Sequence, residues 1–376
     1  MRADVADLFE FDPGMTHLNH GAFGAVPRVV REAQDRARAR VEAVPMRAFR
    51  DELPPAIAAA REHAVAFLGV PADSAALVRN VSEGVAVALE ALAIGRGDDV
   101  VVSSHGYPTV TLAVQARGGS VRRADFGLSA TAAEAVAALT DALTPDTRLV
   151  VIDQITSPTA LVLPVAEVAA AVAPIPVLVD AAHVPGALPD LDVAALGVAF
   201  WVGNLHKWAF APRSAAVLWV DPRYRDRVRP LVTSWSQGRP YPASFDLQGT
   251  VDPSAWLAVP DAIAFWHGLG GWSQVERNAD LLLRGADHVA TELGTAGQPS
   301  GIRHAPCMRL VALPPGVAET KEGADALWQQ LYAAGFAVPP VSFGGRGHVR
   351  VAAQAYNDED DYARLAETLV SLVGSA

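Results

Sequence analysis

Lys207 is a candidate nucleophile because its amine follows a strand-like run and lies between two ring-bearing side chains. The apolar run 200–203 precedes it, and His206 and Trp208 flank it. An amine in such surroundings loses part of its hydration, which lowers its pKa and favours the free base that Schiff-base formation requires. A lysine after a strand can equally be a solvated surface residue, so its position alone identifies only a candidate.

Asp180 is a second candidate, because it ends the apolar run 177–179. A carboxylate at the end of a buried strand needs a partner for its charge. It could be the N-cap of a following helix. It could also pair with a pyridinium nitrogen, so that the ring can accept electrons released at a substrate α-carbon. His183 would then lie against that ring or its phenolic oxygen.

The segment Ser82-Glu83-Gly84 opens a helical pattern directly after a strand-like run. Backbone amides and a hydroxyl at the positive end of a helix can bind a phosphate. A plain helix start followed by an acid explains the same residues equally well. The segment is therefore a candidate phosphate site only in combination with other signals.

Strand-like and helical patterns alternate along the first two thirds of the chain, and they would position these candidate residues. Apolar runs without polar alternation, separated by helical patterns, predict an α/β fold with a mostly parallel, seven-stranded sheet covered on both faces. The predicted strands are 76–79, 99–103, 120–125, 148–152, 177–180, 200–203 and 215–220, and the intervening helices include 83–93, 132–143 and 165–172. Ligands of such sheets bind at the carboxyl ends of the strands, and polar residues follow most of these runs.

The alternation of strand-like runs and helical patterns ends at a passage rich in Pro, Ser and Gly, from 230 to 253. We place a domain boundary there, with a large domain over 1–245 and a small C-terminal α+β domain over 246–376. The small domain is predicted to contain a strand at 308–313, a helix at 323–334, a strand at 348–352 and a last helix from 358. We expect the segment 1–25 to pack with the small domain.

Composition limits the classes of partner. The formal net charge is -11 and the Lys and Arg residues are scattered, which excludes a nucleic-acid surface and leaves a small molecule as the expected partner. The single cysteine, Cys307, excludes an internal disulfide and a cysteine-rich zinc site, and no histidine spacing suggests another metal site. The first residues lack the pattern of an export signal, and no run approaches the roughly 20 apolar residues of a membrane span. We expect a cytoplasmic protein.

Several motifs, in order along the chain, resemble the class V aminotransferase family, in its isopenicillin N epimerase-like branch. They are Asp-Ala-Ala-His at 180–183, Gly-Asn-Leu-His-Lys-Trp at 203–208, and the segments 18–24, 154–160, 249–254 and 349–357. The resemblance extends over nearly the whole chain. It implies the fold-type I architecture of pyridoxal-phosphate-dependent transferases, with pyridoxal 5'-phosphate as cofactor and an amino acid as substrate.

The resemblance also implies roles for individual residues. Lys207 matches the Schiff-base lysine, Asp180 the partner of the pyridine nitrogen, and His183 a residue beside the phenolic oxygen. Other expected cofactor contacts are Ser82, Glu83, Gly84 and His206 around the phosphate, Ser157 and Asn204, either Tyr107 or His105 stacked on the ring, and Thr250 reaching the phosphate of the neighbouring subunit. Thr250 implies a homodimer. Arg350 matches the arginine that grips the substrate α-carboxylate, with Asn19 as a further substrate contact. Arg47 either lines the mouth of the active site and contacts substrate, as the resemblance suggests, or is a solvated helix residue.

Two positions depart from the pattern of relatives. Asn204 stands where many relatives have Ser or Thr, which affects an expected phosphate contact, and Gly106 stands where relatives near the epimerase have an acid.

The sequence determines the cofactor more closely than it determines the type of reaction. The leading hypothesis is removal of the α-proton of a modified amino acid followed by elimination of a β-sulfur group, in bacterial secondary metabolism. Epimerisation at the α-carbon is the alternative, followed by transamination or decarboxylating oxidative deamination, and by a non-catalytic cofactor-binding module. A persulfide-forming desulfurase is disfavoured, because the stretch 341–357 has no cysteine and Cys307 lies well before it.

Overall fold

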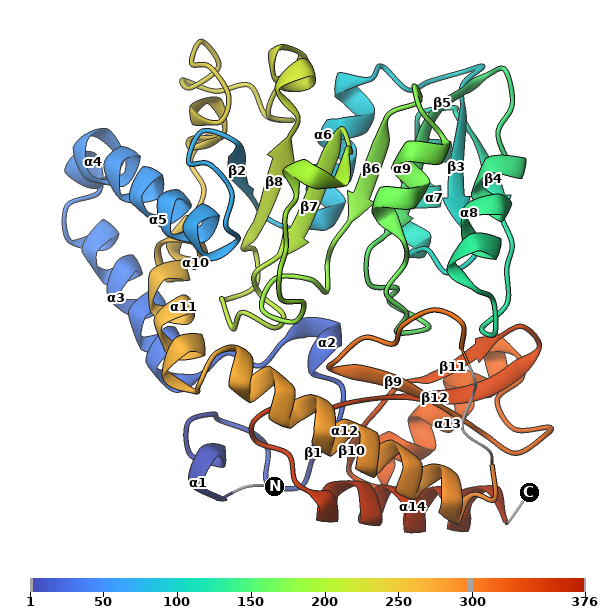
Figure 1. Ribbon diagram of the computed structural model, residues 1–376. Helices are drawn as coiled ribbons and strands as arrows, with labels where there is room; N and C mark the ends of the chain where they lie inside the picture. Colours follow the sequence, from blue (N-terminus) through green and yellow to red (C-terminus); the bar gives the residue numbers. More distant parts are fainter. Residues whose placement is uncertain (1–2, 296–299, 375–376) are drawn as a thin grey trace.

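A computed structural model describes residues 3–295 and 300–374. Its main feature is a seven-stranded sheet with the strand order β2-β8-β7-β6-β5-β3-β4 (Figure 1). The pairs among β4, β3, β5, β6 and β7 are parallel, whereas β8 is antiparallel to both β7 and β2. The strands are β2 (Ala75–Val78), β3 (Asp99–Ser103), β4 (Ser120–Ala124), β5 (Thr147–Asp153), β6 (Val177–Asp180), β7 (Phe200–Asn204) and β8 (Ala216–Val220).

Both faces of this sheet are buried except at the edge strand β4, which is largely exposed. In the inner strands, alternate residues belong to two different hydrophobic clusters, as Val150 and Ile152 do on one face and Leu149 and Val151 on the other. Helices cover the faces because they connect parallel strands. The helices of this part are α1 (Ala3–Ala6), α2 (His20–Phe23), α3 (Arg28–Ala43), α4 (Pro45–Arg47), α5 (Leu53–Phe67), α6 (Val81–Ala91), α7 (Pro108–Ala116), α8 (Ala132–Asp141) and α9 (Val165–Ala171).

The C-terminal part has its own sheet, of order β11-β12-β9, and a third hydrophobic cluster. Its strands are β9 (Met308–Ala312), β10 (Phe336–Ala337), β11 (Pro340–Phe343) and β12 (Arg346–Ala352). Its helices are α13 (Lys321–Ala333) and α14 (Glu359–Val373), which follow α10 (Ser254–Leu257), α11 (Val259–Gly268) and the long α12 (Trp272–Glu292). In Figure 1, α12 runs below the large sheet and beside α14.

The N-terminal segment joins this C-terminal part. Strand β1 (Thr16–His17) pairs in parallel with β10, and the Leu18 side chain belongs to the third hydrophobic cluster. The backbone amide of Ala352 also donates to the carbonyl of Leu18. Residues 18–24 therefore lie where the end of β12 meets the loop that carries Lys207.

The structure confirms the predicted fold class, and the predicted strands differ from the observed ones by one or two residues at their ends. Helix α6 begins at Val81 rather than at 83, because Asn80 is its N-cap and accepts from the amide of Glu83. Strand β5 continues to Asp153, one residue beyond its predicted end. The division into domains at residue 245 stays a prediction.

The helices of the described residues include none that is long and apolar enough to cross a membrane. The same residues contain no group of three or more His, Cys, Asp or Glu side chains arranged to hold a metal ion.

Candidate active site

Lys207 lies in the loop after β7, and the fold buries it to an exposed fraction of 9 %. Its Nζ lies 3.2 Å from Nε2 of His183, which follows β6. Burial, as the largest cause, lowers the pKa of Lys207 to about 8, although the charge of Asp180 opposes this shift. The neutral amine is therefore accessible near neutral pH, as the sequence predicted for a nucleophile.

His20, which was not predicted as a site residue, contacts the backbone at Lys207. Its Nε2 lies 3.0 Å from the carbonyl oxygen of Lys207, and its Nδ1 lies 3.1 Å from the hydroxyl of Tyr356. Since a carbonyl only accepts, Nε2 carries the hydrogen and Nδ1 accepts from Tyr356. Burial lowers the pKa of His20 to about 4, which agrees with this neutral form. The motif 18–24 was the only sequence signal for this residue.

Two carboxylates lie side by side at the carboxyl ends of β5 and β6. Asp180 is buried, and its Oδ1 accepts from the amide of Ala182. Asp153 is its register partner on β5 and is equally buried. Burial raises the pKa of both, and for Asp153 the charge of Asp180 adds to this shift. Asp153 was not predicted as a site residue, although it ends an apolar run just as Asp180 does.

The structure separates the two candidates for a ring-stacking residue. His105 is fully buried, with Nε2 donating to the carbonyl of Phe126 and Nδ1 accepting from the hydroxyl of Thr159. Its ring packs on Phe126, with centroids 4.3 Å apart. Tyr107 is instead 46 % exposed and lines a cavity together with Asp153. The geometry favours Tyr107, because the ring of His105 is already packed against Phe126 and Phe343.

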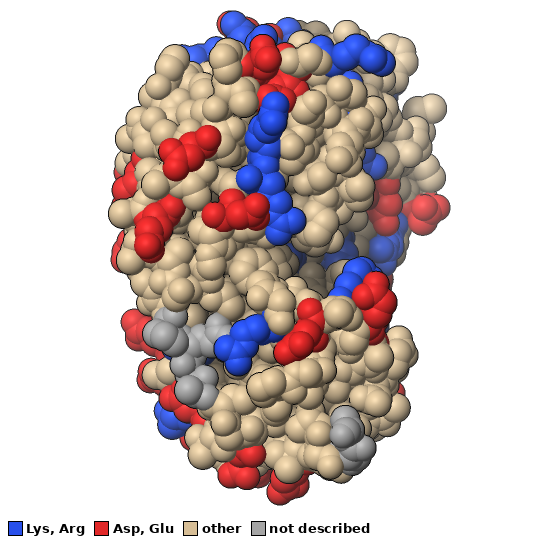
Figure 2. Space-filling model, turned by 90° about the vertical axis from the view of Figure 1, so that its right-hand side faces the viewer, with Lys and Arg blue, Asp and Glu red and all other residues tan. Residues whose placement is uncertain are grey.

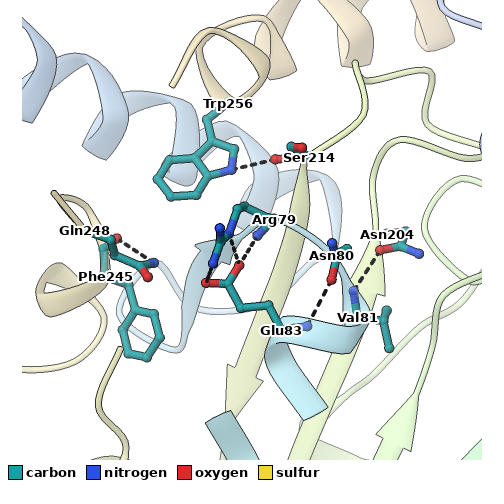
Figure 3. A network of polar contacts seen from close by, with 9 residues as sticks. All are labelled: Arg79, Asn80, Val81, Glu83, Asn204, Ser214, Phe245, Gln248 and Trp256. Carbon is teal, nitrogen blue, oxygen red and sulfur yellow. Dashed lines mark hydrogen bonds and ion pairs between the residues drawn. The ribbon is translucent and has the colours of Figure 1, made fainter. Parts of the chain in front are cut away.

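The start of α6 is the candidate phosphate site, and Figure 3 shows its surroundings. Ser82 is exposed in the first turn. The Glu83 carboxylate is turned back toward Arg79, where Oε2 accepts from the backbone amide at 2.6 Å and from Nε at 3.1 Å. The arginine balances the negative charge of Glu83, which would otherwise oppose a phosphate at this helix end.

Asn204, Gly84 and His206, the other residues predicted near the phosphate, make contacts that hold this region of the chain together. Asn204 is at the end of β7, and its Oδ1 accepts from the amide of Val81 at 3.1 Å (Figure 3), so the side chain that replaces the Ser or Thr of relatives ties α6 to β7. Gly84 allows close helix–sheet packing, because a Cβ there would lie 2.5 Å from Val202. His206 contacts the carbonyl of Ala215 through Nδ1, and burial lowers its pKa to about 4.

Arg350 on β12 is a buried guanidinium whose hydrogen-bond partners are neutral. It donates to the carbonyl of Ser157, to Ser157 Oγ at 3.3 Å, and to Asn19 Oδ1 at 2.8 Å. Its Nε is buried without a partner among the described residues. Burial lowers the pKa of Arg350 to about 10. A buried cation of this kind is stabilised by a bound anion, and a fork of N–H groups fits a carboxylate.

A cavity of about 560 Å³ lies next to these groups. Asp153 lines it from the end of β5, Tyr107 and Ser157 from the loops that follow β3 and β5, and Ser342 and Phe343 from β11. Its size is in the range of sites for drug-sized ligands. Figure 2 looks from the side of β4 and β11 and shows a hollow between the upper and lower parts of the molecule, with charges of both signs around it.

Two of the predicted site residues lie apart from this cluster. Arg47 is on α4, where its side chain is 63 % exposed and Nε pairs with Glu52 at 2.7 Å. Thr250 is exposed in the passage before α10. Within one chain, neither is brought together with Lys207.

The other predicted site residues are suited to a ligand with a planar ring and a phosphate group. Lys207 offers a buried amine, Asp180 offers a buried carboxylate, and Ser82 is an exposed hydroxyl in the first turn of α6. His183 Nδ1 is buried without a hydrogen-bond partner among the described residues, which is costly unless a ligand provides one. These are the groups that pyridoxal phosphate requires for its aldehyde, ring nitrogen, phosphate and phenolic oxygen.

Comparison with known proteins agrees with this arrangement. The family model described as "Aminotransferase class-V" matches residues 24–278. Isopenicillin N epimerase from Streptomyces clavuligerus is 30 % identical, over 96 % of this chain and 96 % of that protein. The putative L-cysteine desulfhydrase 1 of Oryza sativa subsp. japonica is 28 % identical, over 98 % of this chain and 85 % of its own length.

A solved structure with the same fold is that of the cystine C–S lyase C-DES in complex with its reaction product cysteine persulfide. The TM-score is 0.79 with 21 % identity, and the match covers 98 % of this chain and 99 % of that one. At this level of identity, the likeness applies to the fold.

The lowered pKa of Lys207 can be tested because the protein has only two lysines, Lys207 and Lys321. In the cofactor-free protein, the rate of acetylation of Lys207 should rise with pH around a midpoint near 8. The exposed Lys321 serves as the internal control, and its hydrogen bond to Asp325 raises its pKa above the ordinary value. Peptide mass spectrometry gives both rates in one sample, and equal midpoints for the two lysines would contradict the burial argument.

Proposed function

The chain belongs to the class V aminotransferase family and is a pyridoxal-phosphate-dependent enzyme, and on that premise we propose that it is a carbon–sulfur lyase. Its substrate in this proposal is an amino acid with a sulfur group on the β-carbon. The reaction removes the α-proton and then releases the sulfur group together with the electrons of the Cβ–S bond. A role in bacterial secondary metabolism is part of the same proposal.

The observation that carries the proposal is the buried guanidinium of Arg350 close to Lys207. The charge of Arg350 contributes to the lowered pKa of Lys207, so the guanidinium is near enough to act on the amine. An α-carboxylate bound by Arg350 would neutralise one of them and place the α-carbon near the amine. Asn19 and Ser157 orient the guanidinium by accepting from Nη2 and Nη1.

Bound pyridoxal phosphate supplies the aldehyde that links to an amine and the ring that withdraws electrons from the substrate α-carbon. We place its ring nitrogen at Asp180, its phenolic oxygen at His183, its phosphate at Ser82 with Asn204 and His206, and one ring face against Tyr107. In this arrangement Lys207 holds the cofactor until substrate arrives.

After substrate has displaced it, Lys207 is the base for the α-proton. Its Nζ lies 3.2 Å from His183 Nε2, which can accept a hydrogen bond from the amine and orient its lone pair. Burial favours the neutral amine, and the charge of Asp180 limits the shift so that the pKa of Lys207 stays at about 8. A base with a pKa near the working pH can take a proton and return it.

Two observations favour elimination over persulfide formation. The relatives named above include a putative L-cysteine desulfhydrase. Cys307 is the single cysteine, and it is buried with its pKa raised to about 12 by desolvation. A thiol with this pKa is a poor nucleophile.

Epimerisation is the second candidate, because the relative with 30 % identity is an isopenicillin N epimerase. It would use the same first proton transfer to Lys207, and the α-carbon would then regain a proton on its other face. Transamination and decarboxylating oxidative deamination also start from a bound amino acid. Product analysis separates these reactions, since each gives a different product.

We further propose a homodimer located in the cytoplasm. Thr250 and Arg47 are exposed within one chain, which agrees with contacts to the site of a second subunit. Three apolar side chains are also strongly exposed, at 96 % for Trp235, 76 % for Met46 and 73 % for Phe23. A partner subunit that covers such residues would remove apolar surface from water.

Replacing Arg350 by lysine should weaken substrate binding, because a lysine offers a point charge in place of the two-pronged hydrogen bond. We expect a loss of roughly 1.5–3 kcal/mol for each hydrogen bond to the carboxylate. The measurement is KM for an amino-acid substrate, with the absorbance of the bound cofactor as a check that the site is intact. Arg346→Lys is the matched control, since Arg346 is exposed at the start of the same strand. An unchanged KM in Arg350→Lys would contradict the proposal that Arg350 binds the α-carboxylate of the substrate.

The proposed reaction can be tested with a panel of S-substituted cysteines and bulky amino acids, using mass detection of the products. A lyase should give a 2-oxo acid, ammonia and a sulfur-containing product from S-substituted cysteines. Cys307→Ser should retain this activity, because the thiol is not used. A D-amino acid as the main product would support epimerisation instead, and loss of all activity in Cys307→Ser would restore a desulfurase-type mechanism.

A further inference from the structure

Asp153 is a buried carboxylate that the proposed reaction does not use. Its exposed fraction is 3 %, and it is the last residue of β5. Its register partner on the neighbouring parallel strand is Asp180. In-register residues of adjacent strands are about 4.8 Å apart along the sheet and point to the same face. Two carboxylates therefore lie side by side where we place the ring nitrogen of the cofactor.

Within the part of the chain that the structure describes, this pair of acids has no direct cationic partner. None of the salt bridges among the described residues involves Asp153 or Asp180. Lys207 is the nearby cation whose charge acts on both. Two buried anions at this distance repel one another, and they are stabilised by a proton or by a cation placed beside both.

Asp153 also contacts the two loops that frame the cavity. Its carboxylate accepts from the backbone amides of Tyr107 and Ser157. A Cβ at Gly106 would lie 3.4 Å from Asp153 Oδ2 and 3.1 Å from the carbonyl of Ser103, so the loop before Tyr107 runs tightly against this carboxylate. The side chain thus connects the end of β5 with the candidate stacking residue and with the residue that holds Arg350.

Accepting two backbone amides does not by itself require a charged side chain. Asparagine or serine could accept at the same place, and burying either costs less than burying a carboxylate beside a second one. The charge is balanced if the ligand of this site is cationic next to both acids. A protonated pyridine nitrogen has that property.

We infer that Asp153 is a second anionic residue for the protonated ring nitrogen of the cofactor, acting beside Asp180, and a positioning residue for Tyr107 and Ser157. The inference rests on the proposed function, in which Asp180 faces that nitrogen. In this inference Asp153, at the end of β5, and Asp180, at the end of β6, together balance the positive charge of the ring nitrogen. Without Asp153, Asp180 alone would balance that charge.

The test uses cofactor-free protein and two ligands. One is pyridoxal 5'-phosphate, and the other is its analogue in which a CH group replaces the ring nitrogen and cannot be protonated. Dissociation constants are measured for the parent, Asp153→Asn and Asp180→Asn. Asp153→Asn should weaken binding of pyridoxal phosphate by about tenfold or more, from the loss of one charge near the nitrogen, and should leave binding of the analogue nearly unchanged.

The control variant is Asp99→Asn, which removes a buried carboxylate at the opposite end of the same sheet and should change neither constant. If Asp153→Asn weakens both ligands equally, or neither, Asp153 has no charge-dependent role and the inference fails. If Asp180→Asn also shows no preference between the ligands, the placement of the ring nitrogen in the proposed function fails as well. Asp153→Ser gives the same comparison if the asparagine variant does not fold.

Discussion

The central physical constraint of this protein is the burial of four charged groups in one small region. Lys207, Arg350, Asp153 and Asp180 are each exposed by less than a tenth, and no salt bridge among the described residues joins any of them. Desolvation shifts the pKa of each toward its neutral form. Such an arrangement is costly in a protein without ligand, and it becomes favourable when a ligand supplies a cation for the acids and an anion for the arginine.

The fold positions these groups through several elements that are distant in sequence. Parallel strands β5 and β6 bring the two acids to one edge of the large sheet, and β7 leads into the loop with Lys207. The N-terminal segment and β12 lie across this edge, so that His20 holds the backbone of Lys207 and Asn19 holds Arg350. A change in the contact between the two parts of the chain would therefore alter both the amine and the carboxylate-binding group.

Much of this could be predicted from the sequence, because the local signals were strong. Apolar runs separated by helical patterns gave the seven strands of the large sheet nearly to the residue, whereas the short strands β1, β10 and β11 were not predicted. The motifs around Asp180 and Lys207 pointed to the family. Asp153 and His20 were missed as individual residues, since the importance of Asp153 depends on a register partner and that of His20 on a contact with a residue 187 positions away. The sequence also could not show that His105 is engaged by Phe126 and Thr159 while Tyr107 lines the cavity, because these contacts join distant parts of the chain.

The most direct test of the account is to reduce the cofactor-loaded protein with borohydride and locate the cofactor by peptide mass spectrometry. The protein has two lysines, so the result is a choice between them. The account predicts that the cofactor is fixed on the peptide that contains Lys207, and that Lys207→Ala carries no label. A label on Lys321, or a protein that retains the cofactor and gives no labelled lysine, would contradict it.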